Sequence, residues 1–137
     1  MENNKKLRVA AYVRVSEETK ETQHSLQAQE DFYRRQIHEN AEWELAGIYK
    51  DNGISGTDIK RREGLVSLIS DCETGKIDLI LVKSVSRFAR NTLDLLRIVR
   101  YLKQMGVAVW FEEQNINSLT EEGELMLTLM ASVAQAE

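Results

Sequence analysis

The sequence LRVAAYVRVS at residues 7–16 decides the fold that we expect for this chain. Most of its residues are apolar or β-branched, which is typical of a strand buried in a parallel sheet. Arg14 interrupts the apolar run, and the hydroxyl of Ser16 closes it. Ligands of open α/β sheets bind outside the carboxyl ends of the strands, so the stretch predicts a strand that delivers Ser16 to an active edge. The alternative is that Ser16 only starts a loop and that Arg14 reaches solvent.

Length and composition predict one soluble globular domain. The chain has 137 residues, of which 42% are hydrophobic and 29% are charged, and this is enough for a single core. No apolar run approaches the roughly 18 residues that cross a bilayer. Arg8 and Arg14 break the first apolar stretch and no small-residue cleavage site follows, so we expect no secretory signal. We therefore expect a cytoplasmic protein without a membrane partner.

The residues that usually bind metals are scarce. Cys72 is the only cysteine, which excludes an internal disulfide and a cysteine cluster for zinc, and we expect it to be buried on a helix. His24 and His38 fall in one predicted helix among polar neighbours, so we expect both to be solvated. The chain also lacks a GxxxxGK[ST] loop, which disfavours a nucleotide-driven kinase or ATPase. We expect no metal and no cofactor.

The charge distribution favours a local site for an anion. The net charge of −4 argues against a chain that coats nucleic acid indiscriminately. Residues 83–103 nevertheless hold six basic residues against Asp94, whereas residues 112–124 hold five glutamates and no base. A positive site on an acidic body suits recognition of a defined phosphate. Three of the basic residues are expected on a solvated helix face: Arg97, Arg100 and Lys103.

Hydrophobic spacing predicts strands that alternate with helices. After the first strand, further strands are predicted at 43–51, 78–83 and 107–111, and helices at 25–40, 64–73, from Asn91 or Thr92 to Gly106, and 121–137. Ser25 is the predicted cap of the first helix. Two glycines indicate a mobile loop up to Arg62, and 112–120 is expected to be a polar connection. This order predicts an α/β fold with a mostly parallel sheet of about four or five strands and helices on both faces.

The last predicted helix, 121–137, has an apolar stripe and no closing signal. An apolar stripe can face the core, but a terminal helix that carries methionines also suits a partner surface. The pattern contains no glycine, asparagine or basic residue near its end, so we expect a longer helix that is cut here.

The predicted topology brings four candidate residues to one sheet edge: Arg14, Ser16, Arg87 and Arg90. A serine nucleophile in acyl transfer usually needs a histidine held by a carboxylate, and no strand end offers one. Guanidinium groups instead donate pairs of hydrogen bonds to phosphate and stabilise the charge that develops on it. The pattern therefore favours phosphoryl transfer to Ser16.

Four ordered motifs resemble the catalytic domain of serine recombinases, the resolvases, invertases and large serine integrases. They are YVRVS at 12–16, DNGISG at 51–56, SRFARN at 86–91 and ASVAQAE at 131–137. The chain is most similar to the large integrase and transposon branch. The resemblance implies a resolvase-like fold, a catalytic domain at 1–120, and the start of a long interface helix at 121–137. It also implies that the DNA-binding region is absent from this chain.

The resemblance implies roles for several residues. Ser16 would be the nucleophile that attacks a DNA phosphodiester and forms a 5′-phosphoserine link. The scissile phosphate would be held by Arg14, Arg87 and Arg90.

Two further matches leave alternatives open. Gln29 falls on the family's active-site glutamine, although an exposed helix residue would fit the same place. Arg62 falls on its loop arginine, with Arg61 as the alternative. Ser86 departs from the aspartate that many resolvases have at this position, and this puts in doubt any carboxylate that would order Arg87.

As the family implies, the partners are double-stranded DNA and copies of the same protein. A homodimer would bind one site and a homotetramer would form at synapsis, with no small-molecule substrate. The isolated domain should bind DNA weakly, because few of its basic residues are free to contact the DNA backbone and sequence reading lies elsewhere, and its activity should be absent or weak. Two other functions fit the residues: a small phosphatase or phosphotransferase that uses Ser16, and a non-enzymatic module that docks through its last helix.

Overall fold

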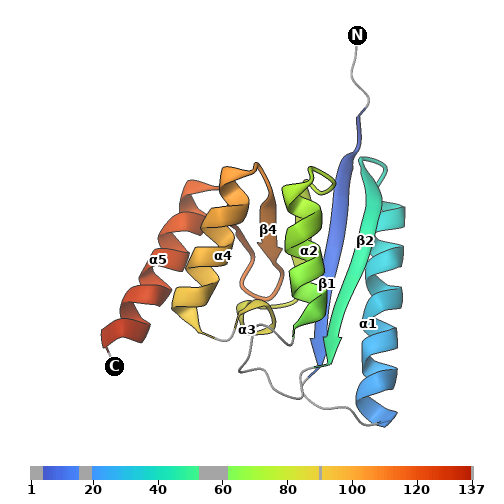
Figure 1. Ribbon diagram of the computed structural model, residues 1–137, viewed down its shortest axis with the longest axis horizontal. Coiled ribbons are helices and arrows are strands. Elements are labelled where there is room, and N and C mark those ends of the chain that lie inside the picture. The colour runs from blue at the N-terminus through green and yellow to red at the C-terminus, as the bar shows by residue number, and fades with distance from the viewer. Residues whose placement is uncertain (1–4, 16–19, 53–61, 90, 137) are drawn as a thin grey trace.

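The computed structural model describes residues 5–15, 20–52, 62–89 and 91–136. The elements follow in the order β1 (Leu7–Val15), α1 (Lys20–Glu39), β2 (Trp43–Asn52), α2 (Glu63–Glu73), β3 (Leu79–Val82), α3 (Val85–Phe88), α4 (Thr92–Gln104), β4 (Ala108–Phe111), β5 (Ile116–Asn117) and α5 (Glu121–Ala136). Strands and helices alternate along most of the chain (Figure 1).

The strands form one sheet in the order β2-β1-β3-β4-β5. β1 pairs in parallel with β2 and β3, and β3 pairs in parallel with β4. The short β5 runs antiparallel to β4. The carboxyl ends of the four parallel strands therefore meet at one edge of the sheet, beside α3 (Figure 1). The predicted fold class, a mostly parallel sheet of four or five strands, is confirmed.

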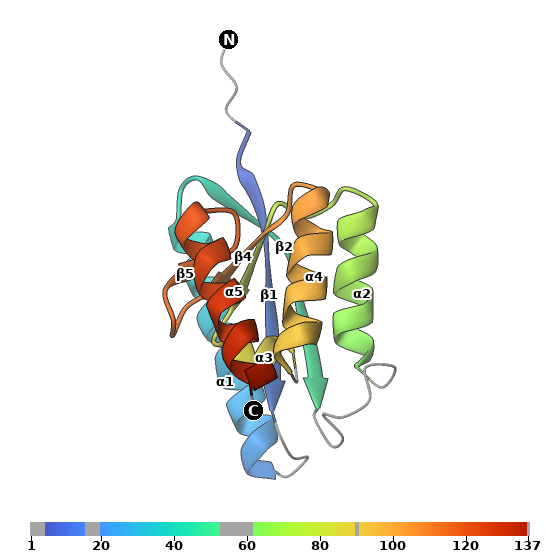
Figure 2. The same ribbon diagram turned by 90° about the vertical axis from the view of Figure 1, so that its left-hand side faces the viewer.

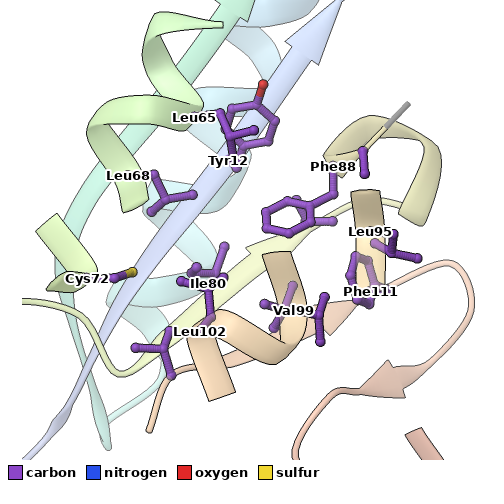
Figure 3. Close-up of a cluster of buried hydrophobic side chains, with 14 of the residues drawn as sticks. Tyr12, Leu65, Leu68, Cys72, Ile80, Phe88, Leu95, Val99, Leu102 and Phe111 are labelled. Carbon is purple, nitrogen blue, oxygen red and sulfur yellow. The ribbon is translucent and has the colours of Figure 1, made fainter. Parts of the chain in front are cut away.

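Helices cover both faces of the sheet, as predicted (Figures 1 and 2). On β1, Val9, Ala11 and Val13 pack in the cluster that contains α1, while Ala10 and Tyr12 belong to the larger cluster built with α2, α4 and α5. Figure 3 shows the Tyr12 ring within this larger cluster, with its hydroxyl at the edge. Because β1 is buried on both faces, its sequence is a nearly continuous apolar run.

The prediction that Ser25 caps the first helix is wrong. α1 begins at Lys20, so Ser25 lies inside the helix. The residues before it, KETQH, contain neither glycine nor proline and can all continue a helix. The Ser25 hydroxyl oxygen accepts a hydrogen bond at 3.4 Å from Nε2 of Gln29, which lies one helical turn after Ser25. The serine hydroxyl therefore bonds a side chain within α1 and does not bond the first helical N–H groups.

Two short elements were not predicted. α3 is only four residues long, and β5 is a two-residue strand in the stretch expected to be a polar connection. Ile116 of β5 is buried and pairs with Phe111. Neither element is long enough to produce a hydrophobic period, so local sequence carries no signal for it.

The predictions for Asn91, Cys72 and the two histidines are confirmed. The Asn91 side chain caps α4 by accepting from Asp94 N at 2.9 Å. Cys72 is buried on α2, and burial raises the pKa of its thiol to about 12. His24 and His38 are exposed. Among the described helices, none is long and apolar enough to cross a membrane.

The basic residues of α4 are less free than predicted. Arg97 is exposed, but Arg100 Nη2 lies 2.9 Å from Glu124 Oε2 of α5. Lys103 Nζ lies 3.9 Å from the other oxygen of the same carboxylate. The positive charges lower the pKa of Glu124, chiefly through the hydrogen bond from Arg100. These pairs join α4 to α5.

The predicted mobile loop cannot be compared over residues 53–61, which lie outside the described residues.

Candidate active site

The predicted site lies at the carboxyl edge of the sheet. Arg14 is near the end of β1, Arg87 is on α3, and Arg62 precedes α2. The crossover topology brings these three arginines together although they are far apart in sequence. Ser16 and Arg90 lie outside the described residues, so their places in the site stay predictions.

Arg14 and Arg87 bind each other's backbone. Arg14 Nε donates to the Arg87 carbonyl at 3.2 Å, and Arg14 Nη2 donates to the Ser86 carbonyl at 2.9 Å. In return, Arg87 Nη1 donates to the Arg14 carbonyl. Burial lowers the pKa of Arg14, and the positive charges of Arg62 and Arg87 lower it further. Such crowding of positive charge favours binding of an anion.

Arg62 is the most buried of the three arginines, with 3% of its surface exposed. It donates to the Tyr12 hydroxyl from Nε at 3.2 Å and from Nη2 at 2.8 Å. Nη2 also donates to the carbonyls of Phe88 at 2.7 Å and of Arg87 at 3.2 Å. The guanidinium thus connects β1 with α3. Of the two arginines considered, Arg62 is placed at this edge, and Arg61 lies outside the described residues.

Sequence reasoning missed the roles of Tyr12 and Asp51. The Tyr12 hydroxyl donates to Asp51 Oδ2 at 2.6 Å. The same carboxylate accepts from the backbone N–H groups of Gly64 at 2.7 Å and Leu65 at 3.0 Å, at the start of α2. Burial, followed by the hydrogen bond to Asp51, raises the pKa of Tyr12. The available signal was a tyrosine inside a buried strand and an aspartate at the end of the neighbouring one.

The described contacts do not join Gln29 to the three arginines. Gln29 is on α1, and its side chain contacts Ser25. It lines a cavity of about 550 Å³ together with Tyr33 and Glu112. Tyr33 donates its hydroxyl to Glu112 Oε1 at 2.7 Å, which ties α1 to the end of β4. A catalytic role for Gln29 stays a prediction.

A second cavity of about 330 Å³ opens beside Arg14. Ser86 and Asn91 line it, as does Met130 of α5. The Ser86 side chain is exposed, and its hydroxyl lies 3.1 Å from that of Ser84. Ser86 holds Arg14 through its backbone carbonyl, so this contact does not require the aspartate that many resolvases have here.

No group of three or more His, Cys, Asp or Glu side chains within the described ranges is arranged to hold a metal ion. In the part of the chain that the structure describes, the site instead contains arginines, backbone carbonyls, one tyrosine and one carboxylate. This donor set suits a phosphate ester more than a divalent cation.

Comparison with known proteins places this fold and site in a family. Residues 9–137 match the profile described as "Resolvase, N terminal domain". The chain belongs to this family of resolvase domains. The resolvase domain is 36% identical over 90 residues to a resolvase/recombinase of Pseudomonas putida, which covers 66% of this chain and 48% of that protein. It is 38% identical over 106 residues to the Tn21 resolvase of Escherichia coli, covering 72% and 55% of the two chains.

Solved structures agree with this assignment. The resolvase domain superposes on a resolvase family site-specific recombinase from Streptococcus pneumoniae with a TM-score of 0.77 and 32% identity, covering 96% of this chain and 87% of that one. It superposes on the N-terminal catalytic domain of TP901-1 integrase with a TM-score of 0.76 and 26% identity, covering 93% and 94%. The chain spans about half the length of the curated relatives that it matches.

Proposed function

We propose that this resolvase domain is the catalytic part of a site-specific DNA recombinase, with Ser16 as its nucleophile. The observation that carries the proposal is the pair of partly exposed arginines, Arg14 and Arg87, at the sheet edge toward which β1 leads. The similarity to resolvases and to the catalytic domain of an integrase supports the same function. Arg90, which follows α3, is proposed to join the phosphate-binding arginines.

The proposed reaction exchanges one ester for another. Ser16 Oγ forms a bond to phosphorus while the bond from phosphorus to the 3′ oxygen breaks, and the serine proton ends on that oxygen. Negative charge grows on the phosphate oxygens as the fifth oxygen approaches, and guanidinium groups stabilise it. Attack by a 3′ hydroxyl of the exchanged strand reverses the step and frees Ser16. The number and type of ester bonds are unchanged, so no nucleotide has to be hydrolysed.

We further propose how the domain works within a longer protein. Residues 1–120 would form the catalytic unit, and α5 would be the start of a subunit interface helix. DNA-sequence reading would belong to a part beyond these residues, as the greater length of the curated relatives suggests. The partners would be double-stranded DNA and further copies, paired on one site and tetrameric at synapsis, in the cytoplasm.

A covalent-adduct experiment tests the nucleophile. The full-length protein is incubated with DNA of a candidate recombination site, and the products are separated by denaturing electrophoresis. The wild type should give a protein–DNA adduct whose modified residue maps to Ser16 by mass spectrometry. Ser16→Ala should abolish the adduct while DNA binding persists, and Ser70→Ala, an exposed position on α2, is the matched control. An adduct on another side chain, or wild-type adduct yield from Ser16→Ala, would refute the proposal.

A further inference from the structure

We propose that Arg62 is a positioning residue that holds α3 in place, and that it does not itself contact the scissile phosphate. This inference rests on the proposed function and separates Arg62 from Arg14 and Arg87. Arg14 and Arg87 are partly exposed, whereas Arg62 is 3% exposed. A phosphate in a DNA duplex lies on the surface of a rigid polymer. A guanidinium buried beneath the protein surface cannot reach it without leaving its present partners.

The first part of the argument concerns the end of α3. A helix leaves its last carbonyl groups without helical partners. α3 has only four residues, so most of its carbonyls are in this position. Arg62 Nη2 donates to the carbonyls of Phe88 and Arg87. The guanidinium therefore supplies the hydrogen bonds that a further helical turn would have provided.

The second part concerns what holds Arg62. Its Nε and Nη2 both donate to the Tyr12 hydroxyl, and the guanidinium carbon lies 5.3 Å from the centre of the Tyr12 ring. Tyr12 in turn donates to Asp51, which is fixed by the first N–H groups of α2. Arg62 thus ties α3 to β1, and through Tyr12 to β2 and α2. We call the hydrogen bonds from Arg62 to Tyr12, Arg87 and Phe88 the Arg62 brace. The positive charge and the planar set of N–H donors of the Arg62 guanidinium therefore both interact with partners inside the protein.

The consequence for the site follows from the position of Arg87. Arg87 lies in α3, and its carbonyl is one of the acceptors of Arg62. The brace therefore fixes the backbone from which the Arg87 side chain extends toward β1. Loss of the brace should misplace Arg87 without removing any group that touches DNA.

Hydrogen exchange in the absence of DNA tests the brace directly. In the full-length protein, Arg62→Lys keeps the charge and loses the planar fork. We expect at least about a tenfold loss of amide protection in α3, most clearly at Ala89, whose N–H donates to the Val85 carbonyl. Arg97→Lys, on the exposed face of α4, is the matched control and should leave α3 unchanged. Unchanged protection in Arg62→Lys would overturn the proposal.

If Arg62→Lys does not fold, Tyr12→Phe provides a second test by hydrogen exchange. This variant keeps Arg62 and removes the hydroxyl that accepts two of its hydrogen bonds. It should lower α3 protection in the same direction by a smaller factor. Full protection in a folded Tyr12→Phe variant would count against the brace.

A double-mutant cycle separates positioning from phosphate contact. If Arg62 acts through Arg87, Arg62→Lys should lower the cleavage rate by no more than about threefold in an Arg87→Lys background, because the side chain that it positions has already been replaced. If the losses from the two substitutions multiply, Arg62 acts independently of Arg87, as a direct phosphate contact would, and the inference is wrong. If the wild type forms no adduct on any substrate, the proposed function fails, and hydrogen exchange still decides whether Arg62 holds α3.

Discussion

At the scale of the residue, Asp51 is the buried carboxylate that joins the elements around the site. It is 7% exposed and accepts from one hydroxyl and two backbone N–H groups. A buried carboxylate is tolerated only when its oxygens have donors, and here they come from β1 and from the start of α2. Asp51 therefore joins three elements at the edge where chemistry is proposed.

Asp51→Asn should lower the free energy of unfolding by about 1–3 kcal/mol. The amide group that replaces one oxygen would face an N–H donor or the Tyr12 hydroxyl, and at least one buried donor would lose its acceptor. Urea denaturation followed by circular dichroism measures the change. Asp31→Asn, on the exposed side of α1, should stay within about 0.5 kcal/mol of the wild type. Equal stability of the two variants would contradict the structural role given to Asp51.

At the scale of elements, α2 packs unusually close to β2. A Cβ atom added at Gly64 would lie 2.4 Å from the Lys50 carbonyl oxygen, which is closer than any real contact. Glycine at this position lets the first turn of α2 approach the strand that carries Asp51. The helix start and the carboxylate that binds it are therefore set by the same close approach.

Gly64→Ala should destabilise the domain by about 1–3 kcal/mol, because backbone atoms have to move apart to admit the methyl group. The shift should also weaken the two N–H bonds to Asp51. Thermal unfolding measures the effect, and Ser67→Ala, an exposed position on α2, is the control in which the same residue is introduced without a clash. A Gly64→Ala variant as stable as Ser67→Ala would show that α2 is free to shift.

α1 is held to β2 by Glu30, whose carboxylate accepts from Lys50 Nζ and Arg34 Nη2, each at 3.0 Å. The hydrogen bond from Lys50, followed by that from Arg34, lowers the pKa of Glu30 from its ordinary value of 4.5. A carboxyl whose pKa is lower in the folded state stabilises the fold above its ordinary pKa. That contribution is lost as the pH falls through the folded-state value.

Glu30→Gln should therefore cost up to about 1 kcal/mol at neutral pH, and the difference from the wild type should diminish as the pH is lowered from 7 toward 3. Chemical denaturation at several pH values measures it. Glu42→Gln, in the exposed turn before β2, should show no such trend. A difference that grows in acid would have the wrong sign for this ion pair.

At the scale of the whole molecule, α5 has one face in the core and one face uncovered. Leu127 is fully buried, whereas Leu125, Met126 and Leu129 are exposed although they are large and apolar. Contiguous exposed apolar side chains are typical of an interaction surface. The prediction that the stripe faces the core is confirmed for the side of α5 that carries Leu127, and the exposed side fits the proposed subunit interface.

Leu125→Glu should weaken self-association of the full-length protein by at least about tenfold if this face is the proposed subunit interface. Sedimentation velocity over a range of concentrations measures it. Val66→Glu on α2 is the matched control, because Val66 is 50% exposed and Leu125 is 60% exposed, but Val66 lies on a different helix. Association of Leu125→Glu at wild-type strength would remove α5 from the proposed interface.

By itself, the sequence determined the alternation of elements, the buried β1 strand and the edge at which Arg14 and Arg87 meet. These features follow from hydrophobic period and from the rule that parallel strands end at one edge, and both can be read from local sequence. Only the tertiary structure decided that Arg62 is buried against Tyr12, that Asp51 caps α2, and that β5 and α3 exist. Each of these depends on a few hydrogen bonds between residues far apart in the chain, which have no local period and form only after the sheet has brought their elements together.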